Sequence, residues 1–321
     1  MKEFLVNEND AGQRLDKFVW KVTVSLPKSL LYKAIRTKKI KVNRKRGEIG
    51  QILSAGDTVQ LFLPPEFFGE KENAWKSLTP CLSVVYEDNN LLIADKPEGV
   101  SCHADEVQKT GTLIDHIKAY LYEKGEFCPE EENSFSPALA NRIDRNTTGL
   151  VICAKNAVAL REASELIRSR RVQKKYLAIV HGTFSEPHGV LTHYLLKKED
   201  ENRVEVYSAP HPGALSAVTE YRVRQSDPRR DLSLLEITLH TGRTHQIRAQ
   251  FAAAGHPLLG DSKYGKEREK SAFSHQALRA VSLEFFPREG EVLFYLAGKT
   301  FSAPPDERFS HFGEKAGENP R

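Results

Sequence analysis

The stretch NRIDRNTTGLVICA, residues 141–154, joins a polar, arginine-rich segment directly to a short apolar run. The run at 150–154 predicts a strand of the core. A loop that leads into a core strand holds its side chains rigidly, so a nucleophile or an acid would be well placed there. Asp144 is the candidate, because Arg142 and Arg145 flank it and nearby cations keep a carboxylate ionised. A salt-bridged turn explains the same residues equally well.

The pattern around this strand mixes strands and helices. Apolar runs predict a hairpin of strands at 82–86 and 91–94, and further strands at 176–180 and 232–239. Helical spacing predicts helices at 112–121, 158–167 and 244–254, the last with Gly242 and Thr244 as turn and cap residues. Strands outnumber helices and do not alternate cleanly with them. The fold class is therefore α+β, with a mixed, largely antiparallel sheet flanked by helices and loops.

A smaller unit precedes this domain. Residues 12–36 predict two short helices, and 39–43 and 58–63 predict strands, which together make a small α/β domain over residues 1–64. The Pro-, Gly- and charge-rich segment 65–80 predicts a linker. We expect the larger domain to span 81–310 and residues 311–321 to form a disordered tail.

Positive charge is concentrated at the N-terminus. The chain of 321 residues has a net charge of +4, but residues 1–64 alone carry 13 Lys or Arg and 6 Asp or Glu. The densest part, LYKAIRTKKIKVNRKR (31–46), has eight basic residues and no acidic one, with apolar residues interleaved. We expect it to fold and to bind phosphate, although a solvated helix face is the alternative. The candidate side chains are Arg14, Lys28, Lys33, Arg36, Lys38, Lys39, Lys41 and Arg44.

Several classes of protein lack support. The four cysteines are scattered without a C-x-x-C pair, which argues against a zinc cluster or a disulfide framework and fits a reducing cytoplasm. The first residues lack the apolar stretch of a secretory signal, and no run is long enough to span a membrane. No P-loop or G-x-G-x-x-G follows a strand, so a nucleotide cofactor is unsupported.

Two further segments place polar residues within apolar structure. In KKYLAIVHG (174–182), Tyr176 stands at the start of a predicted strand, either as a core or edge residue or as a platform for a nucleobase. In HTGRTHQIR (240–248), four polar residues crowd a loop–helix junction. His240 and His245 lack the spacing of metal ligands, and no carboxylate is close. Backbone donors at a helix start plus two arginines favour an anion or phosphate site.

These segments together resemble the RluA-type pseudouridine synthases. NRIDRNTTGL resembles the family's H-R-L-D-x-x-T-S-G-L signature, and KKYLAIVHG resembles its second motif. LHTGRTHQIRAQFAAAGHPLLGDSKYG (239–265) resembles its third motif closely, and DKPEGV (95–100) matches its D-K-P-x-G strand exit. The resemblance covers residues 82–300 in the right order. Residues 12–64 resemble the alpha-L RNA-binding domain, which commonly precedes this catalytic domain.

The resemblance implies an isomerase that converts uridine to pseudouridine in structured RNA, with large-subunit ribosomal RNA as first choice and transfer RNA as the alternative. It implies a monomer without metal or cofactor. Asp144 falls on the catalytic aspartate, Tyr176 on the tyrosine that packs against the target base, and Arg248 on the basic residue that pairs with the aspartate. The implied substrate-binding residues are Asn141, Arg142, Arg243, His245, Gln246 and Ile247.

One departure from the signature stands out. Asn141 replaces its usual histidine, which weakens any role for a histidine ring there. Two other functions stay open from the residues. A non-catalytic RNA-binding or ribosome-assembly protein would not need the intact Asp, Tyr and Arg. An aspartate-dependent hydrolase of small molecules would not explain the basic N-terminus. Whether Asp144 attacks the base or the ribose, or removes a sugar proton, is also open.

Overall fold

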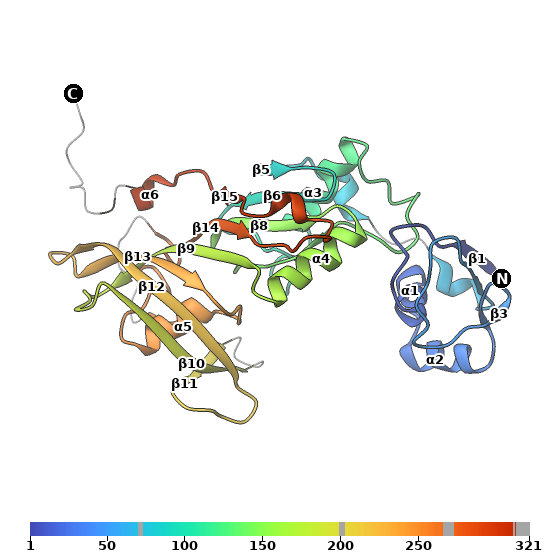
Figure 1. The fold of residues 1–321 in the computed structure, drawn as a ribbon, viewed down its shortest axis with the longest axis horizontal. Coiled ribbons are helices and arrows are strands. Elements are labelled where there is room, and N and C mark those ends of the chain that lie inside the picture. The colour runs from blue at the N-terminus through green and yellow to red at the C-terminus, as the bar shows by residue number, and fades with distance from the viewer. Residues whose placement is uncertain (70–72, 199–202, 266–272, 311, 313–321) are drawn as a thin grey trace.

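A computed structural model describes residues 1–69, 73–198, 203–265, 273–310 and 312. Figure 1 shows a small N-terminal lobe at one end of the molecule and a larger lobe built around a long sheet. We call residues 1–69 the N-terminal lobe and the described residues from 73 onward the large lobe. No helix in the described ranges is long and apolar enough to cross a membrane.

The N-terminal lobe has a core of its own. Its sheet has the order β1-β4-β2-β3, and the two helices pack through fully buried residues such as Phe18 and Ile35. The predicted helices and the strands at 39–43 and 58–63 are confirmed, while β1 and β3 were not predicted. The elements are β1 (Lys2–Leu5), α1 (Leu15–Val22), α2 (Lys28–Arg36), β2 (Ile40–Val42), β3 (Lys45–Arg46) and β4 (Thr58–Leu61).

The large lobe is organised by one long sheet, whose main path runs β11-β10-β12-β13-β9-β14-β8-β6-β5, with β7 and β15 pairing at its side. Among the described strands only β8 and β14 pair in parallel, so the predicted mixed, largely antiparallel sheet is confirmed. The strands are β5 (Ser83–Glu87), β6 (Leu91–Lys96), β7 (Ala138–Leu139), β8 (Thr148–Ala154), β9 (Val172–His181), β10 (His188–Lys198), β11 (Arg203–Tyr207), β12 (Leu215–Asp227), β13 (Leu232–Leu239), β14 (Leu278–Phe285) and β15 (Thr300–Ser302).

Helices cover both faces of this sheet. Alternate residues of β6 point to opposite faces, so Leu92 joins the core under α3 (Leu113–Glu123), whereas Ile93 joins the core under α4 (Ala157–Arg168). The helix α5 (Gln246–Ala253) lies on the same face as α3. Because both faces are covered, every residue of β8 is buried. Shorter elements are η1 (Pro65–Phe68), η2 (Ala74–Ser77), η3 (Phe294–Leu296) and α6 (Glu307–Ser310).

The structure corrects two local expectations, the position of Tyr176 in its strand and the cap of α5. Strand β9 begins at Val172, so Tyr176 lies in its middle and not at its start. The residue before α5 is His245, in the left-handed region at φ 50°, and no side chain caps that helix in the way expected of Thr244. The segment 65–80 holds two 3-10 turns, and Trp75 is buried in the core of the large lobe. Of the predicted disordered tail, Phe312 is buried and the other residues lie outside the described ranges.

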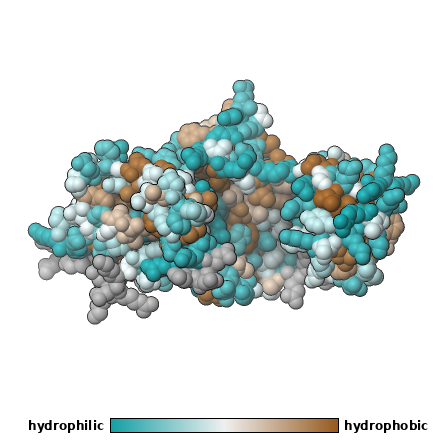
Figure 2. Space-filling view, turned by 90° about the horizontal axis from the view of Figure 1, so that it is seen from below, coloured by the Kyte–Doolittle hydropathy of each residue, from teal (hydrophilic) through white to brown (hydrophobic). Residues whose placement is uncertain are grey.

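A polar joint holds the two lobes together. Asp10 is fully buried between them and accepts hydrogen bonds from Asn133 Nδ2 and Ser134 Oγ of the large lobe, both at 2.6 Å. Arg161 of α4 adds a bond to the carbonyl of Ala11 at 3.0 Å. In Figure 2 the lobes stand side by side with a hollow between them. The N-terminal lobe is therefore anchored at its loop 7–13, and its helices are left clear of this joint.

Candidate active site

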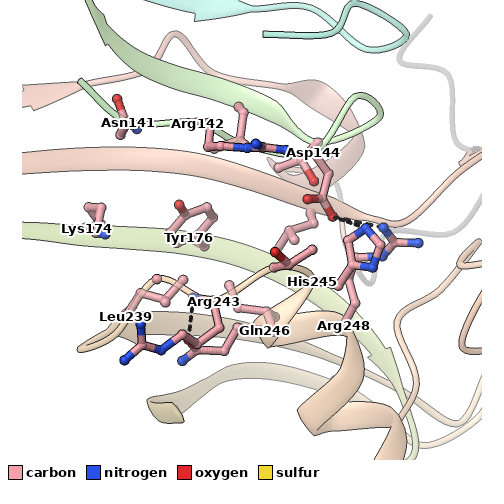
Figure 3. A pocket seen from close by; sticks show the side chains of 16 residues that line it. Asn141, Arg142, Asp144, Lys174, Tyr176, Leu239, Arg243, His245, Gln246 and Arg248 are labelled. Carbon is pink, nitrogen blue, oxygen red and sulfur yellow. Dashed lines mark hydrogen bonds and ion pairs between the residues drawn. The ribbon is translucent and has the colours of Figure 1, made fainter. Parts of the chain in front are cut away.

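A cavity of about 170 Å³ opens on the face of the sheet that carries α5. Three segments meet there: the loop before β8, the middle of β9 and the loop before α5 (Figure 3). The lining residues are Asn141, Arg142, Ile143, Asp144, Thr147, Lys174, Tyr176, Leu239, Gly242, Arg243, Thr244, His245, Gln246, Ile247, Arg248 and Leu278. The structure thus brings together the three motifs that the sequence singled out, although Asp144 and Arg248 lie 104 residues apart in the chain.

Asp144 is the one carboxylate among these lining residues. Its Oδ2 accepts a hydrogen bond from Arg248 Nη1 at 2.9 Å. On its far side Arg248 makes two bonds to Asp261, from Nε to Oδ2 at 2.7 Å and from Nη2 to Oδ1 at 2.9 Å. The guanidinium is therefore clamped between a fully buried carboxylate and one that faces the cavity. Two bonds from one planar fork fix its orientation, and with it the position of Asp144.

The flanking arginines do not hold Asp144, contrary to the sequence-based interpretation. Arg145 is exposed and donates its Nε to the carbonyl of Gly99 at 2.9 Å, and Arg142 is exposed in the cavity wall. The expected anion site at the start of α5 is also wrong for Arg248, because two carboxylates already bind that side chain. Burial alone would lower the pKa of Arg248, but the bonds and charges of Asp261 and Asp144 outweigh burial and raise it.

His245 stands beside Asp144, with Nε2 at 3.9 Å from Oδ2. Burial lowers the pKa of His245, partly offset by the charge of Asp144, so its ring is neutral at pH 7. Its Nδ1 lies 3.0 Å from the hydroxyl of Tyr264, which in turn accepts the backbone N–H of Val204 at 3.0 Å. That hydroxyl is free to donate to Nδ1, which favours the tautomer with its proton on Nε2, facing Asp144.

Tyr176 forms one wall of the cavity, opposite Arg248 in Figure 3. Its ring is only 6% exposed and packs in the same core cluster as Ile247 and Leu278. Burial raises the pKa of Tyr176, and the negative charge of Asp144 acts in the same direction. The phenol is therefore neutral at pH 7, and the site presents a flat, fixed ring beside the carboxylate.

A buried lysine supports the loop that carries Asp144. Lys96 is fully buried, and its Nζ donates to the carbonyls of Pro97, Val100 and Arg145 at 2.7–2.8 Å. One ammonium thereby ties the loop after β6 to the loop before β8. Burial lowers the pKa of Lys96 to about 8, while three carbonyl acceptors favour the charged form, so the group is protonated at pH 7.

A glycine allows β8, the strand that follows this loop, to pack closely against β14. Gly149 has φ 108°, and a Cβ there would stand 2.1 Å from the carbonyl oxygen of Ala280 in β14. This is the place where β8 and β14 pair in parallel. Only a residue without a side chain allows the two backbones to approach this closely.

The remaining predicted residues differ in what they offer a substrate. Asn141 uses its side-chain oxygen to accept the N–H of Ile152 at 2.7 Å, and Ile247 is buried in the cavity floor. All four hydrogen-bonding positions of the Gln246 amide go to protein groups, so it holds the loop 241–246 in shape. Arg243 is exposed at the rim, and its side-chain Nε donates to the carbonyl of Ser216 at 3.1 Å.

The predicted phosphate-binding residues of the N-terminal lobe lie away from this cavity. Lys28, Lys33, Arg36, Lys38, Lys39 and Arg44 are all exposed, and Lys41 is half-buried over the ring of Phe62. Arg14 differs from them, because it is paired with Asp16 at 2.9 Å. Among the described residues there is also no group of three or more His, Cys, Asp or Glu side chains that could hold a metal ion.

Comparison with known proteins identifies the family. Residues 90–253 match the family described as RNA pseudouridylate synthase, just over half of the chain. The chain is 33% identical over 306 residues to ribosomal large subunit pseudouridine synthase C of Buchnera aphidicola, covering 91% of this chain and 92% of the relative. The chain belongs to the RNA pseudouridylate synthase family. The resemblance to RluA-type synthases is confirmed, and the protein is an RNA pseudouridine synthase, an isomerase.

Other relatives of this synthase agree. It is 32% identical over 285 residues to an uncharacterized RNA pseudouridine synthase of Bacillus subtilis, with 88% of each chain covered. The solved structure of human RNA pseudouridylate synthase domain containing 4 covers 71% of this chain and 90% of its own, with a TM-score of 0.55 and 22% identity. At that identity the likeness supports the fold alone.

Four residues of the synthase's site were not singled out from the sequence. Asp261 and Tyr264 lie within the third motif, and Lys96 lies within the D-K-P-x-G match, but no role was attached to them. Lys174 was quoted only as part of the second motif. The signal that could have found Lys174 is period two: it stands two residues before Tyr176 and so shares its face of β9.

Proposed function

We propose that this synthase isomerises uridines of large-subunit ribosomal RNA and that Asp144 is its catalytic carboxylate. The observation that carries the proposal is the clamp on Asp144: the only carboxylate lining the described cavity is oriented by Arg248, which Asp261 holds from behind. The choice of RNA is supported by relatives from several bacteria that are named ribosomal large subunit pseudouridine synthase C. Transfer RNA is the alternative substrate.

The chemistry demands little beyond such a site. Isomerisation breaks the bond from ribose C1′ to uracil N1, turns the base, and forms a bond from C1′ to C5. A proton leaves C5 and one is gained at N1, so no atom or electron is lost overall. Asp144 acts in the step that releases the uracil, either as a nucleophile or as a proton acceptor. Tyr176 packs against the released uracil. The target base must first leave the RNA stack, and contacts with a cavity of matching shape offset the free energy that unstacking costs.

The test is Asp144→Asn, compared with Asp227→Asn at the end of β12, on large-subunit ribosomal RNA transcribed without modification. Pseudouridine is counted by mass-shift labelling. We expect wild type and Asp227→Asn to convert uridine and Asp144→Asn to leave it unchanged. Undiminished conversion by Asp144→Asn would reject its catalytic role. Conversion of transfer RNA transcripts in place of ribosomal RNA would reject the assigned substrate.

We propose in addition that the N-terminal lobe binds RNA through its exposed cations. Lys33 and Arg36 project from α2, and Lys38 follows that helix, with no acidic residue between Lys28 and Arg46 to neutralise them. Changing these three residues to Gln should weaken RNA binding and flatten its dependence on salt, since each phosphate contact releases counterions. An unchanged salt dependence would show that this surface is only solvated. That the protein is a monomer stays a prediction, which sedimentation of the purified chain can check.

A further inference from the structure

A second cavity of about 540 Å³ adjoins the one that holds Asp144. The two share six lining residues, among them Arg142, Lys174 and Arg243, so they form one continuous depression. Figure 3 shows in which direction the depression extends from Asp144. Tyr176 lies between Asp144 and Lys174, and the second cavity begins at Lys174. A strand of RNA whose target base occupies the first cavity must continue past this point.

The lining of the second cavity is cationic and has no carboxylate. Two of its basic residues are neutralised from outside: Arg168 pairs with Glu165, and His240 with Glu220. The other four are Arg142, Arg170, Lys174 and Arg243, and none of them has an ion-pair partner among the described residues. Such an excess of positive charge within one depression suits a polyanion.

Lys174 is the most telling of the four. It is half-buried at the boundary between the cavities, and its Nζ lies beside Gly242, where an added Cβ would come within 3.5 Å of it. Burial lowers the pKa of Lys174, and no neighbouring charge opposes that shift. A partly desolvated ammonium without a counter-ion in the described structure is costly, and a bound anion would remove that cost.

An aromatic ring stands at the edge of the same cavity. Phe286 follows β14, lines the second cavity and is 44% exposed. An exposed aromatic ring beside unpaired cations is the combination with which proteins hold single-stranded nucleic acid, because bases stack on the ring while cations meet the backbone. A free phosphate or a small acid has no base that could stack on the ring.

We propose that the second cavity is a subsite for the RNA strand next to the target uridine, in which Lys174 binds the adjoining phosphodiester and Phe286 stacks a neighbouring base. The inference rests on the proposal that the first cavity holds the target nucleotide. Lys174 and Tyr176 are two residues apart on β9, about 6.6 Å along the strand. One side chain meets the base and the other meets the phosphate beside it.

The experiment compares Lys174 with Lys175, its neighbour on the opposite face of β9, which pairs with Glu236 at 3.9 Å. Full-length protein is acetylated with acetic anhydride, alone and with saturating hexauridylate, and each lysine is read by peptide mass spectrometry. We expect the RNA to protect Lys174 several-fold and to leave Lys175 unchanged. Equal protection of both, or of neither, overturns the subsite. So does inorganic phosphate that protects Lys174 as well as hexauridylate does at equal phosphate concentration.

Variants give a second, independent readout. Lys174→Gln should reduce the slope of log Kd against log salt for hexauridylate by about 0.7, the value for one phosphate contact on a single strand, and Lys175→Gln should not. Phe286→Ala should weaken binding without changing the slope, and Phe286→Trp should restore it. Identical slopes for wild type and Lys174→Gln contradict the proposal. Repeating the labelling on Asp144→Asn, which needs no turnover, keeps this result separate from the outcome of the catalytic test.

Discussion

Replacing Asp261 by asparagine removes the buried half of the clamp on Arg248. The Asp261 side chain has no exposed surface, and Arg248 is nearly as buried. Oδ2 accepts from Arg248 Nε, while Oδ1 accepts from Arg248 Nη2 and from the backbone N–H groups of Lys263 and Tyr264. Asparagine keeps the shape but brings an NH₂ group, which must face at least one of these donors. Asp261→Asn therefore leaves a donor unpaired inside the protein.

The cost follows from these contacts. A hydrogen bond to a charged group contributes about 1.5–3 kcal/mol, and breaking a buried ion pair from one side costs about 3–5 kcal/mol. Arg248 keeps its bond to Asp144 at 2.9 Å, so its charge is not left alone. We therefore expect the lower end of that range, a loss of about 3 kcal/mol in the free energy of unfolding.

Urea unfolding followed by tryptophan fluorescence measures this loss. Trp75 is buried in the core of the large lobe, whereas Trp20 is exposed in the N-terminal lobe, so the signal reports mainly on the relevant part. The control is Asp227→Asn, whose partner Arg230 is half exposed. Water screens a pair of that kind, so it contributes little to stability. If Asp261→Asn costs no more than this control, the clamp does not stabilise the site in the way described.

Three further outcomes follow from the supports of the site. Lys96→Met should lower the free energy of unfolding by about 3 kcal/mol, since the buried ammonium's bonds to three carbonyls are lost. Amide exchange should rise in residues 97–100 and 144–147, and unchanged exchange would contradict this. Gly149→Ala should prevent stable folding. Gly99→Ala, with open space around its Cβ, should lower the free energy of unfolding by only about 1 kcal/mol. Similar melting temperatures for the two variants would refute the close approach of β8 to β14. Burial alone would raise the pKa of Glu87, but hydrogen bonds from Lys124 and other partners lower it from 4.5 to about 2. Up to about 3 kcal/mol of stability is therefore present above pH 4.5 and lost as the pH falls to about 2, and Glu87→Gln should flatten that dependence in urea titrations.

The sequence predicted best what depends on neighbouring residues. The hairpin of β5 and β6 and the helices α3 and α4 follow from apolar spacing, and the structure places them within a few residues of the expected bounds. Tyr176 was placed at a strand start because Gln173, Lys174 and Lys175 interrupt the apolar run. The strand continues through them because β13 and β14 pair on either side.

Contacts between distant residues could not be derived from spacing. The partners of Arg248 stand 104 and 13 residues away, and nothing local shows that both bind the same guanidinium. The link from Val204 to Tyr264 spans 60 residues and joins β11 to the loop after α5. The flanking arginines of Asp144 were a misleading signal, because a loop that enters a buried strand turns its long charged side chains toward water.

The joint at Asp10 has a consequence for how RNA is chosen. The buried Asp10 carboxylate accepts hydrogen bonds from Asn7 of its own lobe and from Asn133 and Ser134 of the large lobe, so the two lobes are tied together at this point. An RNA that touches both must bring its two contact points to a separation that the protein dictates. If the N-terminal lobe binds RNA as proposed, a uridine reaches the cavity only when its distance from the RNA segment held by that lobe matches the fixed spacing of the two lobes.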